Sequence, residues 1–196
     1  MKENYCLPIG YRDRLNNTYF DDTPYKDEFQ DDVYSTAKNV LIENNYKTVI
    51  DIGTGSGFKL IKYFDNLKTI GVDLGPTLIY LQKKYPNKIW CDLESINKEE
   101  EYDLIICSDV IEHIPNPDIF IEKINTINFK TIVFSTPDRI NMYGGNHMGP
   151  PVNSSHVREW SMDEFNEYLN QHYLINKQLK STPNSNTQIV ICSKKI

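Results

Sequence analysis

The stretch from Asp51 to Gly57, with the sequence Asp-Ile-Gly-Thr-Gly-Ser-Gly, has residue types and a spacing suited to a nucleotide-like ligand. Its three glycines stand at alternate positions, directly after an apolar run at 48–52 and before a helical pattern of apolar residues. Glycine adopts backbone angles closed to other residues and lets a ligand approach the main chain. The start of the helix adds free N–H groups. The sequence therefore predicts a ligand-binding loop, with a simple tight turn as the alternative.

The glycine spacing distinguishes between two classes of ligand. The dinucleotide-binding fingerprint requires Gly-x-Gly-x-x-Gly or Ala. Gly53 and Gly55 fit it, but Phe58 occupies the third position. A nicotinamide dinucleotide is therefore disfavoured. The pattern that is present, an aspartate followed by glycines at every second position, resembles the first motif of class I S-adenosylmethionine-dependent methyltransferases.

Two further acids come at the ends of predicted strands. Asp73 follows Gly53 by twenty positions, a spacing at which a carboxylate can accept hydrogen bonds from both ribose hydroxyls. Asp92 ends the next apolar run, where a carboxylate can accept from an adenine amino group while Leu93 packs on the ring. For both acids the alternative is a turn residue at a strand end.

The stretch from Ser108 to Pro117 is similar to the Asp-Val-Leu-Glu-His-Val-Pro-x-Pro stretch of many class I methyltransferases of small molecules, of the type 11/12 kind. With the glycine loop, Asp73 and Asp92, four motifs of that family occur in order over residues 47–135. The resemblance implies a seven-stranded sheet and S-adenosylmethionine as the methyl donor. The cofactor-binding residues that it implies are Asp51, Gly53, Thr54, Gly55, Asp73, Leu74, Asp92, Leu93, Ser108, Asp109, Val110 and His113.

Methyl transfer from a sulfonium requires no metal and no covalent enzyme intermediate, because the donor carries its own leaving group. We therefore expect no metal site. The protein must align acceptor, methyl group and sulfur, and a hydroxyl acceptor also needs a base with a pKa near neutral. Histidine suits that task. The candidate bases are His147 and His156 in the loop after the fifth predicted strand, His113 in the motif, and Asp138, whereas His172 is expected at the surface.

Residues 136–160 form a connection long enough to be functional. Hydrogen-bonding side chains stand there beside aromatic rings, a combination suited to a polyhydroxylated acceptor. The predicted acceptor-binding residues are Arg139, Tyr143, Asn146, Arg158 and Trp160. The stretches 137–139 and 156–161 also resemble methyltransferases linked to surface-glycan synthesis. The sequence thus predicts O-methylation of a sugar or glycan. The alternatives are another acceptor, such as a quinone, lipid precursor or metabolite, and a cofactor-binding regulatory subunit without turnover.

Apolar, β-branched runs alternate with helical patterns along the chain, which predicts an α/β fold with a parallel sheet. Two closing strands, near 173–180 and 187–193, add an antiparallel edge. We expect a Rossmann-like seven-stranded sheet, mostly parallel with an antiparallel C-terminal strand, and helices on both faces. One domain is predicted over 1–196: an N-terminal arm or lid (1–28), a cofactor-binding core (29–135), the acceptor loop (136–160), and a C-terminal helix and strand pair (161–196).

The chain of 196 residues has a formal net charge of −6 and four cysteines without Cys-x-x-Cys spacing. An acidic chain without basic runs matches a phosphate backbone poorly, so no nucleic-acid partner is predicted. The cysteines suggest neither a zinc ribbon nor a disulfide framework. The sequence shows no signal core and no stretch near the ~20 apolar residues of a membrane span. We expect a cytoplasmic protein with a small-molecule or carbohydrate acceptor and no membrane partner; a homodimer is left open.

Overall fold

The computed structural model describes residues 3–24, 29–181 and 186–195, so parts of the predicted arm and of the connection between the two predicted closing strands lie outside it. Within the described residues seven strands form one sheet in the order β3-β2-β1-β4-β5-β7-β6. Strands β1 to β5 are parallel, and β7 is antiparallel to both β5 and β6. The predicted fold class is therefore confirmed. The strands are β1 (Thr48–Ile52), β2 (Lys68–Val72), β3 (Ile89–Cys91), β4 (Glu101–Ser108), β5 (Asn128–Pro137), β6 (Tyr173–Lys180) and β7 (Thr187–Lys194).

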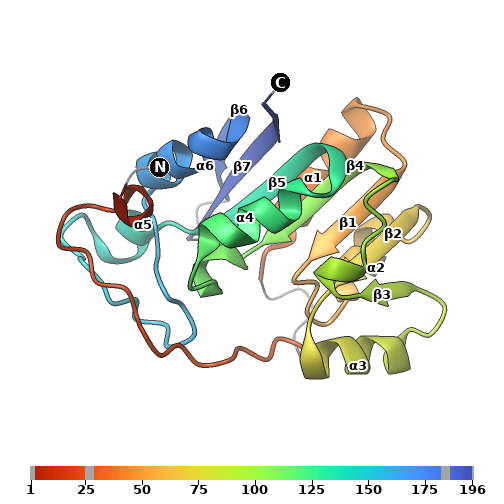
Figure 1. The fold of residues 1–196 in the computed structure, drawn as a ribbon, viewed down its shortest axis with the longest axis horizontal. Coiled ribbons are helices and arrows are strands. Elements are labelled where there is room, and N and C mark those ends of the chain that lie inside the picture. The colour runs from red at the N-terminus through yellow and green to blue at the C-terminus, as the bar shows by residue number, and fades with distance from the viewer. Residues whose placement is uncertain (1–2, 25–28, 182–185, 196) are drawn as a thin grey trace.

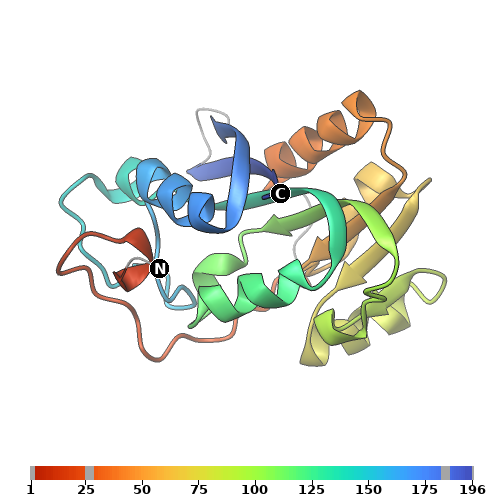
Figure 2. The same ribbon diagram turned by 45° about the horizontal axis from the view of Figure 1, so that its top comes forward.

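Helices cover both faces of this sheet, as Figures 1 and 2 show. Helices α1, α2 and α3 pack on one face, and α4 and α6 pack on the other. No helix in the described part of the chain is both long and apolar enough to cross a membrane. The helices are η1 (Glu3–Cys6), α1 (Asp31–Glu43), α2 (Phe58–Phe64), α3 (Gly75–Lys84), η2 (Leu93–Ser95), η3 (Ile111–His113), α4 (Pro117–Asn125), α5 (Arg139–Tyr143) and α6 (Met162–His172).

The central strands are buried on both faces, which explains their continuous apolar sequences. In β4, Leu104 and Ile106 belong to the core beneath α1, α2 and α3, whereas Ile105 and Cys107 belong to the core beneath α4 and α6. All four side chains are fully buried. Side chains of a strand alternate between the two faces of a sheet, so one apolar run serves both cores. The result is a rigid sheet whose carboxyl edge carries the loops of the site.

Two helices begin at side-chain caps. The side chain of Asn116 accepts a hydrogen bond from the backbone N–H of Ile119 and so caps α4. Ser161 and Glu164 form a capping box at the start of α6, which the Ser-x-x-Glu spacing in the sequence favours. His172, which the sequence placed at the surface, is the last residue of α6 and is mostly buried, with its side chain 14% exposed. The strand begins one residue later, at the buried Tyr173.

The segment after β5 is less open than the sequence predicted. It forms the short helix α5 and then returns to the sheet, where Asp138 and Trp160 make a parallel bridge. The N-terminal segment lies along it, and Figures 1 and 2 show the two running side by side. Backbone hydrogen bonds join them, from the N–H groups of Arg12, Arg14 and Thr18 to the carbonyls of Met148, Val157 and Ser154.

A buried arginine fastens these two segments to the rest of the domain. The side chain of Arg158 is 2% exposed. Its Nε and Nη2 donate to Oδ2 of Asp13 at 3.1 and 2.7 Å. Its Nη1 and Nη2 also donate to the carbonyls of Ile114 and Pro115, each at 2.9 Å. The guanidinium lies 4.4 Å from the ring centre of Tyr5. Because such a charge is costly to bury unless it is paired, these contacts are essential to the packing here.

Candidate active site

Two neighbouring cavities open at the carboxyl ends of β1 and β4, where the strand order of the sheet reverses. Ligands bind at such positions in open α/β sheets. We call the first, with a volume of about 270 Å³, the His156 cavity. We call the second, of about 240 Å³, the Asp73 cavity. The residues that line both are Phe20, Asp22, Gly53, Asp109 and His113.

The glycine loop has the close approach and the unusual backbone angles that the sequence predicted. Gly53 and Gly55 have φ angles of 72° and 55°. A Cβ atom at Gly53 would lie 2.3 Å from a methyl carbon of Val110, and one at Gly55 would lie 1.9 Å from a carboxylate oxygen of Asp22. Any larger residue at either position would therefore clash. The loop runs between these two side chains along the wall of both cavities.

Asp51 holds the glycine loop in place through hydrogen bonds on the side away from the cavities. Its carboxylate is fully buried. It accepts hydrogen bonds from the Tyr34 hydroxyl, at 3.0 and 2.9 Å, and from Oγ1 of Thr54 at 2.7 Å. Burial raises the pKa of Asp51 to about 6. Thr54 lines the His156 cavity, whereas Asp51 lines neither cavity. Asp51 therefore positions the loop and α1.

Asp73 lines the cavity that we name after it. Its two oxygens accept hydrogen bonds from the backbone N–H groups of Gly55, at 2.9 Å, and of Leu74, at 2.8 Å. The Leu74 side chain is exposed. Burial raises the pKa of Asp73, and burial together with the charge of Asp73 raises the pKa of Asp22 to about 6. Two carboxylates thus face each other across the glycine loop.

Asp92 and Leu93, predicted to hold the adenine, line neither cavity. Oδ1 of Asp92 accepts from the backbone N–H of Ser95 at 2.9 Å and from its hydroxyl at 2.8 Å. Leu93 packs against the core under α4 and α6. In this arrangement Asp92 caps the helix η2, which is the turn role that the sequence left as its alternative.

Asp109 stands at the junction of the two cavities with a positive φ of 49°, an uncommon angle for a residue with a side chain. Its carboxylate accepts hydrogen bonds from the Ser135 hydroxyl at 2.6 Å and from the side-chain amide of Gln30 at 3.1 Å. Burial raises its pKa. Ser108 lines the His156 cavity and Val110 the Asp73 cavity, so the turn after β4 contributes to both.

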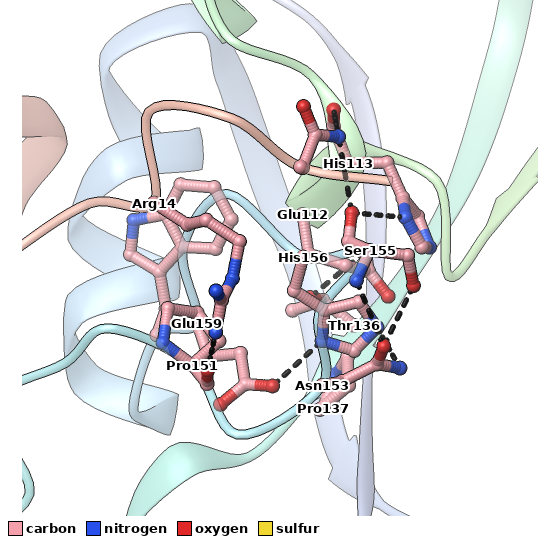
Figure 3. Close-up of polar contacts among 12 residues, drawn as sticks. Arg14, Glu112, His113, Thr136, Pro137, Pro151, Asn153, Ser155, His156 and Glu159 are labelled. Atoms are coloured by element: carbon pink, nitrogen blue, oxygen red, sulfur yellow. Dashed lines mark hydrogen bonds and ion pairs between the residues drawn. The ribbon is translucent and has the colours of Figure 1, made fainter. Parts of the chain in front are cut away.

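Two histidines meet in the wall of the His156 cavity, as Figure 3 shows. The ring centres of His113 and His156 are 4.7 Å apart, with the rings perpendicular. Nδ1 of His113 lies 2.9 Å from the carbonyl oxygen of Ser155, and Nδ1 of His156 lies 2.6 Å from a carboxylate oxygen of Glu159. Burial, and secondarily the neighbouring His156, lowers the pKa of His113 to about 4. His113 is therefore a neutral imidazole near pH 7.

Glu112 completes this group. Its side chain is fully buried in the wall of the His156 cavity. Oε2 accepts a hydrogen bond from the Thr136 hydroxyl at 3.1 Å, and Oε1 has no hydrogen-bond partner among the described residues. Burial, and then the nearby Asp109, raises the pKa of Glu112 well above its ordinary value. One carboxylate oxygen of Glu112 and one nitrogen each of His113 and His156 lie within 4.8 Å of one another, a set that could hold a metal ion.

Two candidate bases from the sequence lie away from these cavities. His147 packs its ring on Tyr143, with 4.7 Å between the ring centres, and lines neither cavity. Asp138 is buried and caps α5 by accepting from the backbone N–H groups of Ile140 and Asn141. The structure brings only His113 and His156 together. His147 and Asp138 lie outside the cavities because the residues after β5 fold into α5, where the sequence predicted a loop.

The predicted acceptor-binding residues also lie outside the two cavities. The Trp160 side chain is fully buried, and its Nε1 donates to the carbonyl of Tyr5 at 2.9 Å. Arg139 is buried and forms an ion pair with Glu164 at 2.5 Å. Arg158 is used in the buried contacts described above. Tyr143, in α5, and the exposed Asn146 line neither cavity. These residues support the wall of the site from outside it.

Sequence reasoning missed several residues that line the His156 cavity: Phe20, Asp22, Gln30, Glu112 and Asn153. Glu112 could have been predicted as a site residue, because it precedes His113 in the motif from Ser108 to Pro117. Phe20 and Asp22 fall in the predicted arm or lid and Asn153 in the predicted acceptor loop, but no motif singled out these residues or Gln30. Only the packing of the N-terminal segment brings Phe20 and Asp22 there.

The sheet topology and the glycine loop at the reversal of strand order are typical of a nucleotide-binding α/β domain. The comparison with protein families shows which class of such domains this is. A family model described as "Methyltransferase domain" matches residues 27–177, so the chain belongs to the methyltransferase domain family. The matched region is a class I S-adenosylmethionine-dependent methyltransferase domain. A search of the curated proteins finds no match.

Solved structures share this fold. The small RNA methyltransferase HEN1 aligns with a TM-score of 0.62 and 21% identity over 94% of this chain and 27% of that protein. The chain therefore spans only 27% of that relative's length. The methyltransferase domain of bacterial CtHen1 aligns with a TM-score of 0.60 and 22% identity, over 82% of this chain and 96% of that domain. A structure from Sulfolobus solfataricus described as a type 11 methyltransferase aligns with a TM-score of 0.62 and 18% identity, over 83% of this chain and 91% of that one. At these identities the likeness establishes the fold.

Proposed function

We propose that this protein transfers a methyl group to a hydroxyl of a sugar or glycan that binds in the His156 cavity. The observation that carries the proposal is the junction of the two cavities. The Asp73 cavity borders the glycine loop at Gly53. The His156 cavity adjoins the Asp73 cavity and is lined by the imidazoles of His113 and His156 and the buried carboxyl of Glu112. Donor and acceptor would thus meet near Asp109 and His113, which line both.

The residues at the junction suit S-adenosylmethionine, which supplies a methyl group on a positively charged sulfur that leaves as a neutral thioether. Asp22, Asp73 and Asp109 all have raised pKa values, mainly because of burial. A cationic ligand offsets the cost of burying such carboxylates. Asp73 would accept from the ribose hydroxyls, and Gly53 and Gly55 would leave room for the ligand along the main chain.

The N-terminal segment 17–22 would serve as a cover over the cofactor. Asn17, Thr18 and Tyr19 line the Asp73 cavity, and Phe20 and Asp22 stand between the two cavities. The Tyr19 hydroxyl makes a 2.5 Å hydrogen bond with Oγ1 of Thr77 on α3, which ties the segment to another wall of the Asp73 cavity. Covers of this kind exclude water from methyl transfer and control access of the ligand.

The lining of the His156 cavity supports a hydroxylated acceptor. Asn153, Gln30 and Ser108 offer hydrogen-bonding groups, and Phe20 and Phe29 offer aromatic rings on which a sugar can stack. These two rings take the role that the sequence assigned to Tyr143 and Trp160. The group formed by Glu112, His113 and His156 would activate the hydroxyl, since His113 stays neutral near pH 7 and keeps a nitrogen lone pair that can accept a hydrogen bond or bind a cation.

The test is turnover of S-adenosylmethionine with a panel of acceptors: free glycans, sugar nucleotides, quinones and small RNA. We expect methyl ethers of sugars. Small RNA belongs in the panel because one structure of similar fold is that of the small RNA methyltransferase HEN1. The net charge of −6 argues against it. Methylation of a quinone or of RNA, with none of any sugar, would contradict the proposed acceptor class.

Replacement of Asp73 by alanine should weaken binding of S-adenosylhomocysteine about 10- to 150-fold. The change leaves the ribose hydroxyls without their charged partner, and such hydrogen bonds contribute roughly 1.5–3 kcal/mol. Titration calorimetry measures the affinity. Asp92→Ala is the matched control, because Asp92 lines neither cavity. Equal affinities of the two folded variants would mean that Asp73 only shapes its turn.

A further inference from the structure

We propose that Glu112, His113 and His156 bind one divalent transition-metal ion, which in turn binds the acceptor hydroxyl. The first half of the proposal concerns the protein alone, and the second half rests on the proposed function. It replaces the expectation, drawn from the donor chemistry, that the site has no metal. The donor set is one carboxylate oxygen and two imidazole nitrogens, all within 4.8 Å of one another.

The spacing of these donors fits an ion. Metal–nitrogen and metal–oxygen bonds in such sites are about 2.0–2.2 Å long, so donor atoms around one ion are at most roughly 4.4 Å apart. The observed limit of 4.8 Å exceeds this by a few tenths of an ångström. Small side-chain rotations close that difference.

Both histidines are held as metal-binding histidines are. Nδ1 of His113 donates to a backbone carbonyl, and Nδ1 of His156 donates to the buried carboxylate of Glu159. Histidine ligands almost always donate their second N–H in this way, which fixes the tautomer and the direction of the ring. The Asn153 side-chain amide donates to Nε2 of His156 at 3.0 Å, so that nitrogen carries the lone pair. On binding, the ion takes the place of this amide hydrogen.

The unpaired carboxylate oxygen of Glu112 is a second, independent observation that supports a cation at this site. Its side chain is fully buried in the cavity wall, and Oε1 has no partner among the described residues. Buried polar atoms are nearly always paired, so an exception needs an explanation. A cation at this position would pair the oxygen. Asp109, which adjoins the group and lines the same cavity, adds negative charge that favours a cation there.

The donor chemistry selects the class of ion. Two imidazoles and one carboxylate suit Mn²⁺, Fe²⁺, Co²⁺, Ni²⁺ or Zn²⁺, whereas Mg²⁺ and Ca²⁺ prefer oxygen ligands throughout. Three protein ligands leave at least one position open, which is the arrangement of catalytic metal sites. That position faces the cavity in which we place the acceptor.

The ion would act as a Lewis acid on the acceptor. A hydroxyl bound to a divalent cation loses its proton more readily, and here the proton passes to water. The acceptor oxygen then forms a bond to the methyl carbon while the carbon–sulfur bond breaks, and the electron pair of that bond stays on sulfur. The products are the methyl ether, S-adenosylhomocysteine and one proton. No atom changes its oxidation state through the ion.

The test measures metal binding by the full chain without any acceptor. Protein freed of metal with a chelator is titrated with Co²⁺, followed by its visible absorption, and with Mn²⁺, followed by electron paramagnetic resonance. We expect one ion per chain, and at least about 100-fold weaker binding by Glu112→Gln and by His156→Asn, since even supporting residues contribute 10- to 100-fold. His147→Asn, which alters a histidine outside the cavities, should bind as the wild type does.

Unchanged binding of S-adenosylhomocysteine and an unchanged Tm show that the Glu112→Gln and His156→Asn variants are folded. Failure of the wild type to bind either ion, or equal binding by all variants, would overturn the metal site. The proposed function fails separately. If the ion binds but no sugar is methylated, the site stands and the acceptor class does not. If chelated protein methylates sugars at the full rate and no ion binds, the function stands and the metal does not.

Discussion

His156→Asn should lower the rate of methyl transfer by ~10²–10⁴-fold, because it removes one of the three groups that we propose activate the acceptor hydroxyl, and that range is typical of groups that assist proton removal. His156 lines the His156 cavity and not the Asp73 cavity, so the affinity for S-adenosylhomocysteine should stay the same. Steady-state turnover and titration calorimetry on the same protein preparation measure the two quantities. The expected result is a loss of kcat with cofactor binding retained.

The matched control is His147→Asn, which should keep its turnover. Both histidines follow β5, and both were candidate bases in the sequence, but the ring of His147 packs on Tyr143 outside the cavities. A loss of turnover in His147→Asn with none in His156→Asn would place the acceptor on α5 and the following residues, as the sequence first predicted.

Arg158→Met should reduce the free energy of unfolding by about 3–5 kcal/mol, because it removes one member of a buried ion pair. Arg158 is 2% exposed, and the change leaves Asp13 without its cation and two carbonyls without donors. For a chain of this length Tm should fall by about 6–20 °C. Chemical denaturation and thermal melting followed by circular dichroism measure both.

Arg12→Met is the control for that change. Arg12 is exposed and its side chain donates to the carbonyl of Gly149 at 3.0 Å, so its loss should cost only about 0.5–1.5 kcal/mol. Adding Asp13→Asn to Arg158→Met should restore part of the lost stability, since it removes the charge left behind. If Arg12→Met and Arg158→Met melt alike, the buried contacts of Arg158 contribute no more than a surface hydrogen bond.

The parts of the fold that depend on neighbours in sequence were predictable. The apolar run of β4 fixes a strand buried on both faces, Ser161 and Glu164 fix the start of α6, and Gly53 fixes a turn that only glycine can make. Each of these signals lies within a few residues of the element that it predicts. The seven-stranded sheet follows from such local patterns taken in order.

The wall of the site depends on contacts between distant segments, and there the sequence misled. Polar and aromatic side chains after β5 suggested acceptor contacts, yet Arg158 pairs with Asp13, which lies 145 positions away in the sequence. Composition alone does not distinguish a charged side chain that faces a ligand from one that is buried against a partner. Glu112 shows the reverse case: a residue within a familiar motif whose importance appears only in its burial and its unpaired oxygen.

The N-terminal segment also couples the two cavities. Phe20 and Asp22 are walls of both cavities, and backbone hydrogen bonds at Arg12, Arg14 and Thr18 hold the preceding residues in place. A ligand that shifts either side chain in one cavity changes the shape of the other. We therefore expect S-adenosylhomocysteine and the acceptor to alter each other's affinity by the same factor.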